Sequence, residues 1–346
     1  MAKTETYGVV FNHWFLKTLG NKSAYQIGVK WRFKMEACNY LYSLNYPEFE
    51  KELCAFEVKS LFNDLMGDKV FFTNIKIDPS VSPFLRNRIE VLFSHSSFTE
   101  LVELVDNEEL HSTDFMVRYV KLYDQDPSFQ MRRSYCKQLG SIIHGEPLYI
   151  SPKEMFGITF YKGMWYFGIL TQNDIIWKEH RDKPYSYSSS IGINIAKVLV
   201  NIAGNGDMSK RIVDPCCGVG TVLLEGVFAG YSIKGWEINR KIAEAARGNL
   251  KHFNYNAQVI TGDIKDIDEV FDISIIDLPY GNFSMTTQDE QQSILKNAKR
   301  ISKKMIIVSA KDISEEIKNE NLVILDRCEV GKNKNSDFIR YVWVCE

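Results

Sequence analysis

The chain has 346 residues, a length that predicts two or three domains with cores of ordinary size. Its hydrophobic content of 45% and charged content of 25% exclude a disordered chain. A formal net charge of −2 excludes a surface that is basic throughout, but it allows a local basic face that binds phosphate.

Other features of the composition bear on the cellular compartment. The first residues lack the long apolar core of a signal peptide, and no apolar run is long enough to span a bilayer. Seven cysteines are scattered along the chain without the spacing of a zinc site, as is typical of reduced thiols. We therefore expect a cytoplasmic protein that has no membrane segment and no metal site.

The amino-terminal half predicts two small α/β units. Residues 1–37 contain several aromatic residues but no motif, and they precede a unit at 38–104; we treat 1–104 as one region. In this unit we expect a strand at 40–44, a helix at 53–66, a strand at 70–77 and a helix at 83–92. In the second unit, 105–171, we expect apolar segments at 115–120, 157–160 and 164–169 around a basic helix at 129–139.

The rest of the chain predicts a linker and one larger domain. Residues 172–189 contain Lys183-Pro184 and a serine run, and they lead into the domain at 190–346. Apolar residues at three-to-four spacing predict a helix at 191–203 that packs on a sheet. Strands and helices then alternate. We expect strands at 211–214, 232–237, 258–261, 271–276 and 305–309, helices at 221–229, 239–253, 288–301 and 313–318, and a closing hairpin of 322–325 and 338–344.

A glycine loop, Asp214-Pro-Cys-Cys-Gly-Val-Gly220, follows the first strand of this domain. Gly218 and Gly220 let the backbone pass close to a ligand because they have no Cβ. The helix that begins at Thr221 offers unpaired N–H groups to the polar tail of that ligand. A loop of this kind at the end of a strand is typical of a nucleoside cofactor site.

Two carboxylates end the next two strands. Glu237, followed by Ile238, is placed to accept hydrogen bonds from both ribose hydroxyls of a nucleoside. Asp263 is placed to accept from the adenine amine, with Ile264 beside the ring. Cys216 is adjacent to a second cysteine in the loop, so the two side chains diverge and are not metal ligands.

The turn Asp277-Leu-Pro-Tyr280 ends a fourth strand and is suited to hold an amine-bearing ring. An exocyclic amine is a poor nucleophile, because its lone pair is delocalised into the ring. Asp277 and the carbonyl of Leu278 would accept its two N–H bonds, Pro279 would fix the turn, and Tyr280 would stack on the base. This orientation favours attack on a sulfonium methyl and needs no metal.

These motifs resemble those of RNA amino-methyltransferases. Residues 214–221 are similar to the Asp-Pro-X-Cys-Gly-X-Gly-Thr motif of that family, and 277–281 are similar to its Asp-Pro-Pro-Tyr-Gly. Residues 183–203 resemble the segment that leads into the catalytic domain of THUMP-containing tRNA guanosine-N2 methyltransferases. The regions at 105–170 and 38–104 resemble, more weakly, a degenerate THUMP domain and the ferredoxin-like domain that precedes it.

The resemblance implies a fold and an activity. The fold is α/β: a class I methyltransferase domain, Rossmann-like with a seven-stranded mixed sheet, preceded by ferredoxin-like and THUMP-like α+β domains. The cofactor is S-adenosylmethionine, and the substrate is the exocyclic N2 amine of a tRNA guanosine, at position ten, methylated once or twice. Ser189 and Ser190 lie near the methionine end of the cofactor. The full cofactor-binding set is then Asp214, Cys216, Gly218, Gly220, Thr221, Glu237, Ile238, Asp263, Ile264, Asp277, Ser189 and Ser190.

One departure from the family keeps other interpretations open. Leu278 stands where the family has its first proline, and the dimethyladenosine rRNA methyltransferases resemble this chain in having an aliphatic residue there. An adenine amine in RNA or DNA, or a protein glutamine amide, is therefore an alternative acceptor. A non-catalytic RNA-binding protein with a vestigial methyltransferase domain is an interpretation from a different class.

Two basic groups are candidates for RNA binding. Arg132, Arg133 and Lys137 lie on one predicted helix, and Arg86 and Arg88 lie on another. Each group can contact phosphates, or it can form an ordinary solvated helix face. With either group, the target base would turn out into the methyl-transfer pocket.

Overall fold

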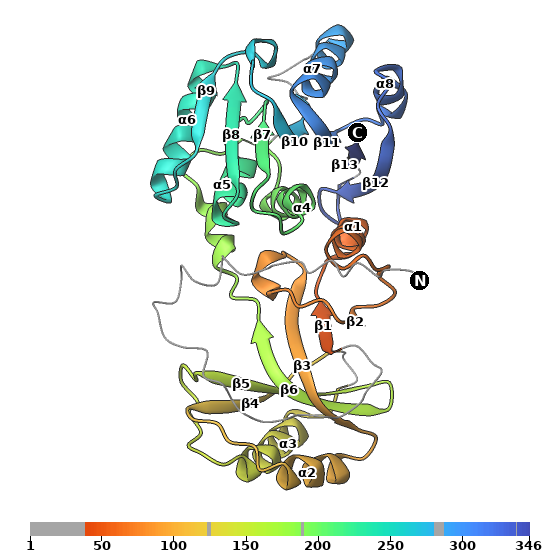
Figure 1. Ribbon diagram of the computed structural model, residues 1–346, viewed down its shortest axis with the longest axis vertical. Helices are drawn as coiled ribbons and strands as arrows, with labels where there is room; N and C mark the ends of the chain where they lie inside the picture. The colour runs from red at the N-terminus through yellow and green to blue at the C-terminus, as the bar shows by residue number, and fades with distance from the viewer. Residues whose placement is uncertain (1–38, 123–125, 188–189, 280–286, 337) are drawn as a thin grey trace, which may run out of the picture.

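The structure, a computed structural model, describes residues 39–122, 126–187, 190–279, 287–336 and 338–346. Two units follow one another along the long axis of the molecule (Figure 1). The N-terminal unit contains β1 to β6 with α1 to α3, and the C-terminal unit contains β7 to β13 with α4 to α8. Among the described residues, no helix has both the length and the apolar character needed to cross a bilayer.

One mixed sheet forms the centre of the C-terminal unit. Its order is β12-β13-β11-β10-β7-β8-β9; β13 runs antiparallel to β11 and β12, and the other neighbours are parallel. This order confirms the predicted Rossmann-like methyltransferase fold. The strands are β7 (Arg211–Asp214), β8 (Ser232–Glu237), β9 (Gln258–Thr261), β10 (Phe271–Asp277), β11 (Ser302–Ser309), β12 (Ile324–Gly331) and β13 (Ile339–Cys345).

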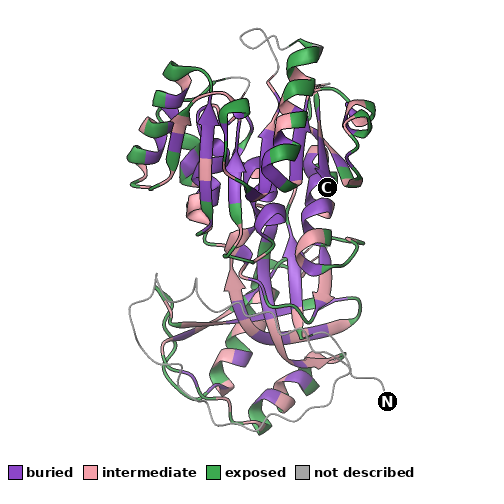
Figure 2. Ribbon diagram, turned by 45° about the horizontal axis from the view of Figure 1, so that its top comes forward, coloured by how far each residue is buried: buried purple, intermediate pink, exposed green. Residues whose placement is uncertain are grey.

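Helices cover both faces of this sheet, so the strands are buried and the outer helix faces are exposed (Figure 2). Ile306 and Val308 of β11 enter the core on the α4 side, whereas Met305 and Ile307 enter the core on the α7 side. This alternation follows from the period of two in a strand. The helices are α4 (Ile193–Gly204), α5 (Thr221–Phe228), α6 (Arg240–His252), α7 (Gln288–Ile301) and α8 (Ser314–Asn319), with a short 3-10 turn η5 (Ile264–Asp266).

A six-stranded sheet of order β2-β1-β3-β6-β5-β4 forms the N-terminal unit. The boundary expected between residues 104 and 105 falls inside α2, and strands from both sides of it share this sheet. The elements are β1 (Tyr40–Leu44), η2 (Glu48–Glu50), α1 (Lys51–Phe62), β2 (Val70–Thr73), η3 (Pro79–Val81), β3 (Leu85–His95), α2 (Phe98–Asn107), β4 (Phe115–Tyr119), α3 (Phe129–Ile142), β5 (Glu154–Tyr161) and β6 (Met164–Gln172).

The helix expected at 83–92 is wrong, because this segment forms the central strand β3. Leu85, Asn87, Arg88 and Ile89 are all buried and only Arg86 among the first five residues is exposed, as is typical of a strand in the middle of a sheet. β3 forms antiparallel hydrogen-bonded ladders with β1 on one side and β6 on the other. Pairing with both neighbours therefore determines the conformation of this segment.

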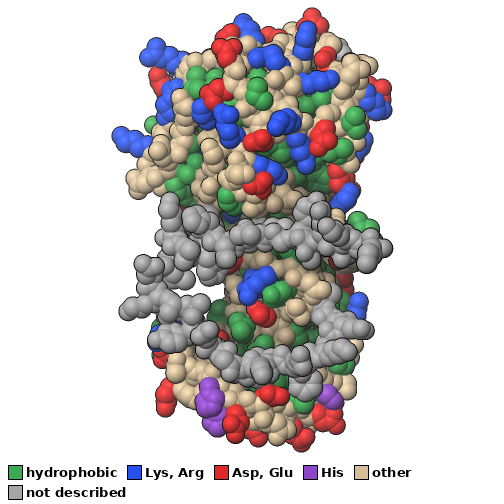
Figure 3. Space-filling view, in the orientation of Figure 1, with side chains coloured by type: hydrophobic (Ala, Val, Ile, Leu, Met, Phe, Trp, Pro, Cys, Tyr) green, Lys and Arg blue, Asp and Glu red, His purple; other side chains and the backbone are tan. Residues whose placement is uncertain are grey.

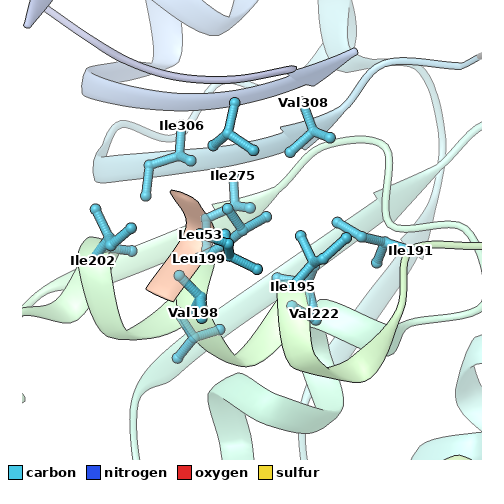
Figure 4. Packing of buried hydrophobic residues seen from close by; sticks show 14 of the residues in the cluster. Leu53, Ile191, Ile195, Val198, Leu199, Ile202, Val222, Ile275, Ile306 and Val308 are labelled. Carbon is cyan, nitrogen blue, oxygen red and sulfur yellow. The ribbon is translucent and has the colours of Figure 1, made fainter. Parts of the chain in front are cut away.

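Helix α1 belongs to the N-terminal unit in sequence but packs in the core of the C-terminal unit. It contacts α4 and β12. Figure 4 shows Leu53 of α1 beside Leu199 of α4, facing Ile275 of β10 and Ile306 of β11. Burying these side chains together stabilises the molecule by about 25 cal/mol for each Å² of apolar surface removed from water. The two units thus share one hydrophobic core.

The expected linker at 172–189 contains an ordered segment that packs on the C-terminal unit. The 3-10 segment η4 (Ile176–Asp182) contacts α4 and α5. Trp177 and His180 are buried, and His180 Nδ1 lies 2.7 Å from Glu225 Oε1 while its Nε2 lies 2.9 Å from the Tyr255 hydroxyl. This segment therefore fixes the C-terminal unit to β6.

The shared core yields a stability prediction. Leu53→Ala removes a fully buried side chain and leaves a cavity between α1, α4 and the sheet, so we expect the free energy of unfolding to fall by about 2–5 kcal/mol. Chemical denaturation measures this change. Leu65→Ala is the matched control, because Leu65 is 78% exposed just beyond the same helix. Equal effects of the two substitutions would contradict the shared core.

Candidate functional site

A cavity of about 470 Å³ opens where the carboxyl ends of β7, β8 and β10 meet. The glycine loop and the Asp277 turn, far apart in sequence, lie on its walls. Gly220 does not line the cavity, and Ser189 and Tyr280 lie outside the described residues. The predicted residues that line it are Ser190, Asp214, Cys216, Gly218, Thr221, Glu237, Ile238, Asp263, Ile264, Asp277, Leu278 and Pro279.

The two loop glycines are needed for different reasons. Gly218 has a φ of +52°, which L side chains rarely adopt, and apart from its two chain neighbours no described residue has an atom within 4 Å of the place of its missing Cβ. That empty space is the cavity. Gly220, with a φ of +81°, precedes α5, and a Cβ there would lie 3.3 Å from Ala246 Cβ. Gly218 therefore leaves room for a ligand, whereas Gly220 allows the turn into α5.

Glu237 connects the end of β8 to the glycine loop. Its Oε2 accepts a hydrogen bond from the Gly218 amide at 3.1 Å, and its Oε1 accepts one from the Asn239 amide at 2.8 Å. Burial raises the pKa of this carboxyl, and the two amide hydrogen bonds lower it in part. Each oxygen keeps a lone pair, so the carboxylate can accept further hydrogen bonds from a ligand.

A hydrogen bond between Asp214 and Cys216 stabilises the same loop. Asp214 Oδ1 accepts a hydrogen bond from the Cys216 amide at 3.2 Å. Burial raises the pKa of Asp214 well above its usual value, and the nearby carboxyls of Asp277 and Glu237 raise it further. Burial also raises the pKa of the Cys216 thiol, so Cys216 is a neutral wall of the cavity.

Two buried polar atoms on the cavity wall have no hydrogen-bond partner among the described residues: Thr221 Oγ1 and Asp277 Oδ1. Burial raises the pKa of Asp277 to about 7, and the positive charge of Arg340 opposes part of that shift. A buried polar atom without a partner destabilises the fold, unless a ligand or water satisfies it. Both atoms are therefore candidates for ligand contacts.

Leu278 continues the sheet beyond the end of β10. Its amide donates a hydrogen bond to the Val308 carbonyl at 2.9 Å, and its side chain is buried in the core below α7. A proline at this position would lose that hydrogen bond, because proline has no N–H. The departure of this chain from the family motif therefore has a structural role here.

The charge of the cavity is one-sided. Its lining has five acidic side chains: Asp214, Glu237, Asp263, Asp277 and Glu290. No lysine, arginine or histidine is among its described lining residues. Such a wall attracts a cation and repels phosphate. Within the described parts of the chain, no group of three or more His, Cys, Asp or Glu side chains has the arrangement of a metal site.

Sequence reasoning missed several lining residues. Tyr187 precedes the serines, and Glu290, Ser293 and Ile294 belong to the first turns of α7. The signal for the last three was present: Thr287 and Glu290 form a capping box, which marks the start of a helix directly after the acceptor turn. Tyr187 has no comparable local signature.

One of the predicted phosphate contacts is wrong. Arg88 lies on β3 and is buried, and its guanidinium donates to the Ile77 carbonyl and to Thr171 Oγ1, both at 2.9 Å. Those hydrogen bonds occupy it within the fold. Arg86 is exposed on the same strand, and Arg133 and Lys137 are exposed on α3, where Arg132 is half-buried.

Comparison with known proteins bears on this geometry. Residues 181–323 match the RMKL-like methyltransferase domain. The chain is 32% identical over 133 residues to the tRNA (guanine(10)-N2)-dimethyltransferase of Methanothermobacter thermautotrophicus. The matched stretch makes up 35% of this chain and 39% of that protein. It is 25% identical over 170 residues to the protein of the same name from Pyrococcus abyssi. This second match makes up 45% of this chain and 50% of that protein. The chain thus spans half or less of the length of these two relatives.

Among solved structures, TrmN from Thermus thermophilus aligns with 89% of this chain and 99% of its own chain. The TM-score is 0.45 and the sequence identity is 12%.

The raised pKa of Asp277 predicts how stability depends on pH. Between its usual value of 3.8 and about 7, the folded protein holds a proton that the unfolded chain has released, so this carboxyl lowers stability as the pH rises through that range. Asp277→Asn removes the titration. We expect the variant without ligand to melt above the wild type at pH 8, with a smaller difference at pH 5. A difference that does not change with pH would contradict the assignment.

Proposed function

We propose that this protein, of which residues 181–323 match the RMKL-like methyltransferase domain, methylates the exocyclic N2 amine of a guanosine in tRNA. The observation that carries the proposal is the position of Asp277, which lines the same cavity as the glycine loop and whose buried Oδ1 has no hydrogen-bond partner among the described residues. The two relatives named as tRNA (guanine(10)-N2)-dimethyltransferases support the choice of base and of RNA.

We propose that S-adenosylmethionine occupies the cavity beside the glycine loop, because the residues present fit it. Glu237 would accept the ribose hydroxyls, Asp263 would accept from the adenine amine, and Thr221 Oγ1 would gain a partner. Ile238, which lines the cavity and is 69% exposed, would be covered by the adenine ring. The acidic lining, without any described basic residue, favours a ligand that carries a sulfonium cation. When bound, this cofactor supplies the methyl group.

The acceptor amine would be held by the turn after β10. Asp277 Oδ1 would accept one N–H bond of the amine and the carbonyl of Leu278 the other, so the nitrogen lone pair is directed at the methyl carbon. Holding it in that geometry and stabilising the positive charge that develops on nitrogen each lower the barrier. With a pKa near 7, Asp277 can then take up the proton that the methylated nitrogen releases.

The N-terminal unit would bind the RNA outside the cavity. Its assignment as ferredoxin-like and THUMP-like domains stays a prediction, and so do the contacts expected of Arg86, Arg132, Arg133 and Lys137. An RNA that is read by its shape and backbone needs such a surface, because the acidic cavity repels phosphate. The target base alone would enter the cavity.

Nucleoside mass spectrometry tests the reaction. We expect tRNA from cells that lack the gene to have lost N2-methylguanosine or N2,N2-dimethylguanosine, and we expect the purified protein with S-adenosylmethionine to restore it. A loss of N6-methyladenosine instead would contradict the choice of guanine. Unchanged modification in the cells and no methyl transfer in vitro would favour a non-catalytic RNA-binding protein.

Asp277→Ala tests the clamp on the amine. We expect kcat to fall by about 10²–10³-fold or more, because one acceptor in a preorganised site contributes on this scale. Calorimetry should show that affinity for S-adenosylmethionine is retained. Asp266→Ala is the matched control, since Asp266 is exposed in η5 and does not line the cavity. Turnover that survives in Asp277→Ala would rule out the assigned role.

A further inference from the structure

A second cavity, of about 370 Å³, opens in the N-terminal unit and has the opposite charge. It lies at the end of β1, before β2, at the start of β3 and after β4. Three cations line it, and no carboxylate is among its described lining residues. Its polar lining residues are Ser43, Asn45, Lys69, Arg86, Asn87 and Lys121.

A row of hydrogen-bonded polar side chains across three strands forms the floor. Ser43 of β1 pairs with Asn87 of β3, and Asn87 pairs with Gln172 of β6. The Asn87 amide nitrogen donates to Ser43 Oγ, and its oxygen accepts from Gln172 Nε2, both at 2.9 Å. Arg118 Nη1 in turn donates to Gln172 Oε1 at 2.5 Å, which brings a further cation to this row. The floor is therefore rigid and polar.

The cations at the rim are exposed, and two of them lack an acidic partner. Neither the Arg86 guanidinium nor the Lys69 ammonium forms an ion pair with a carboxylate in the part of the chain that the structure describes; Lys69 Nζ lies 4.8 Å from the centre of the Tyr46 ring. Like charges that converge on one cavity repel one another, and an anion there relieves the repulsion. The lining thus fits an anionic ligand.

From this lining we propose that the cavity binds backbone phosphates of the RNA substrate. The inference rests on the proposed function, which requires an RNA whose backbone stays outside the acidic methyl-transfer cavity. Lysine, arginine, aspartate and glutamate are interspersed on the visible face of the C-terminal unit (Figure 3), so that face offers no broad cationic surface. Lys69, Arg86 and Lys121 instead gather positive charge around one hollow with polar hydrogen-bonding groups beside it.

The fold holds this phosphate cavity in a fixed relation to the methyl-transfer cavity. β1 continues through η2 into α1, which packs on α4 and β12. β6 continues through η4 to α4, and Ser190 and Ile191 just before α4 line the methyl-transfer cavity. An RNA whose phosphates occupy one cavity is therefore held in a defined position relative to the other.

Salt-dependent RNA binding tests the proposal, with unmodified tRNA transcript as the probe. The variant Lys69→Gln/Arg86→Gln should raise Kd by about 10-fold or more at roughly 0.1 M salt. It should also reduce the slope of log K against log salt by about 1–2, because each lost phosphate contact removes about 0.7–0.9. Affinity for S-adenosylmethionine should be unchanged, which shows that the fold and the other cavity are intact.

The matched control is Lys303→Gln/Lys318→Gln, which removes two cations that are 79% and 59% exposed on the C-terminal unit. Equal losses in the two double variants would overturn the proposal, and so would no loss in either. A variant that binds tRNA normally but loses affinity for inorganic phosphate would show a small-anion site and also overturn it. If the Lys69→Gln/Arg86→Gln variant binds tRNA more weakly but the wild-type protein methylates no guanosine, this inference stands and the proposed function fails.

Discussion

The packing of α1 and α4 against the large sheet is the interaction on which both cavities depend. Apolar burial drives it, and a few buried polar and charged side chains lie within it or beside it. Glu57 of α1 accepts hydrogen bonds from Asn201 of α4 at 2.6 Å and from Ser82 at 2.5 Å, and burial raises its pKa to about 7. Lys197, whose pKa burial lowers, lies 3.8 Å from Glu225. Removing one partner of such a buried contact is costly, because the other is left buried without it.

That arrangement connects the two cavities through short segments of chain. The polar row under the phosphate cavity runs across β1, β3 and β6, and the strands at its two ends lead directly into elements of the shared core. The segment before α4 then forms one wall of the acidic cavity at the end of β7, β8 and β10. Geometry of this kind lets binding energy gained far from the reacting atoms orient them.

Local chemistry explains which parts of the molecule could be predicted. The glycine loop and the acids after β8 and β9 follow their strands at short spacing, so the sequence placed Gly218, Glu237 and Asp263 at one sheet edge. Arg88 could not be placed in this way, because its partners, Ile77 and Thr171, come from distant segments. The strand β3 was missed for the same reason: its neighbours, rather than its own residues, determine its conformation.

The entry of α1 into the other unit's core has a consequence during protein synthesis. α1 ends at Phe62, and the strands that cover its apolar face, β10 to β12, emerge from the ribosome much later. At ordinary translation speeds the delay is on the order of tens of seconds. During that time the apolar face of α1 is exposed and can associate with other nascent chains. A chaperone that binds this helix until the strands are made would therefore raise the yield of correctly folded protein.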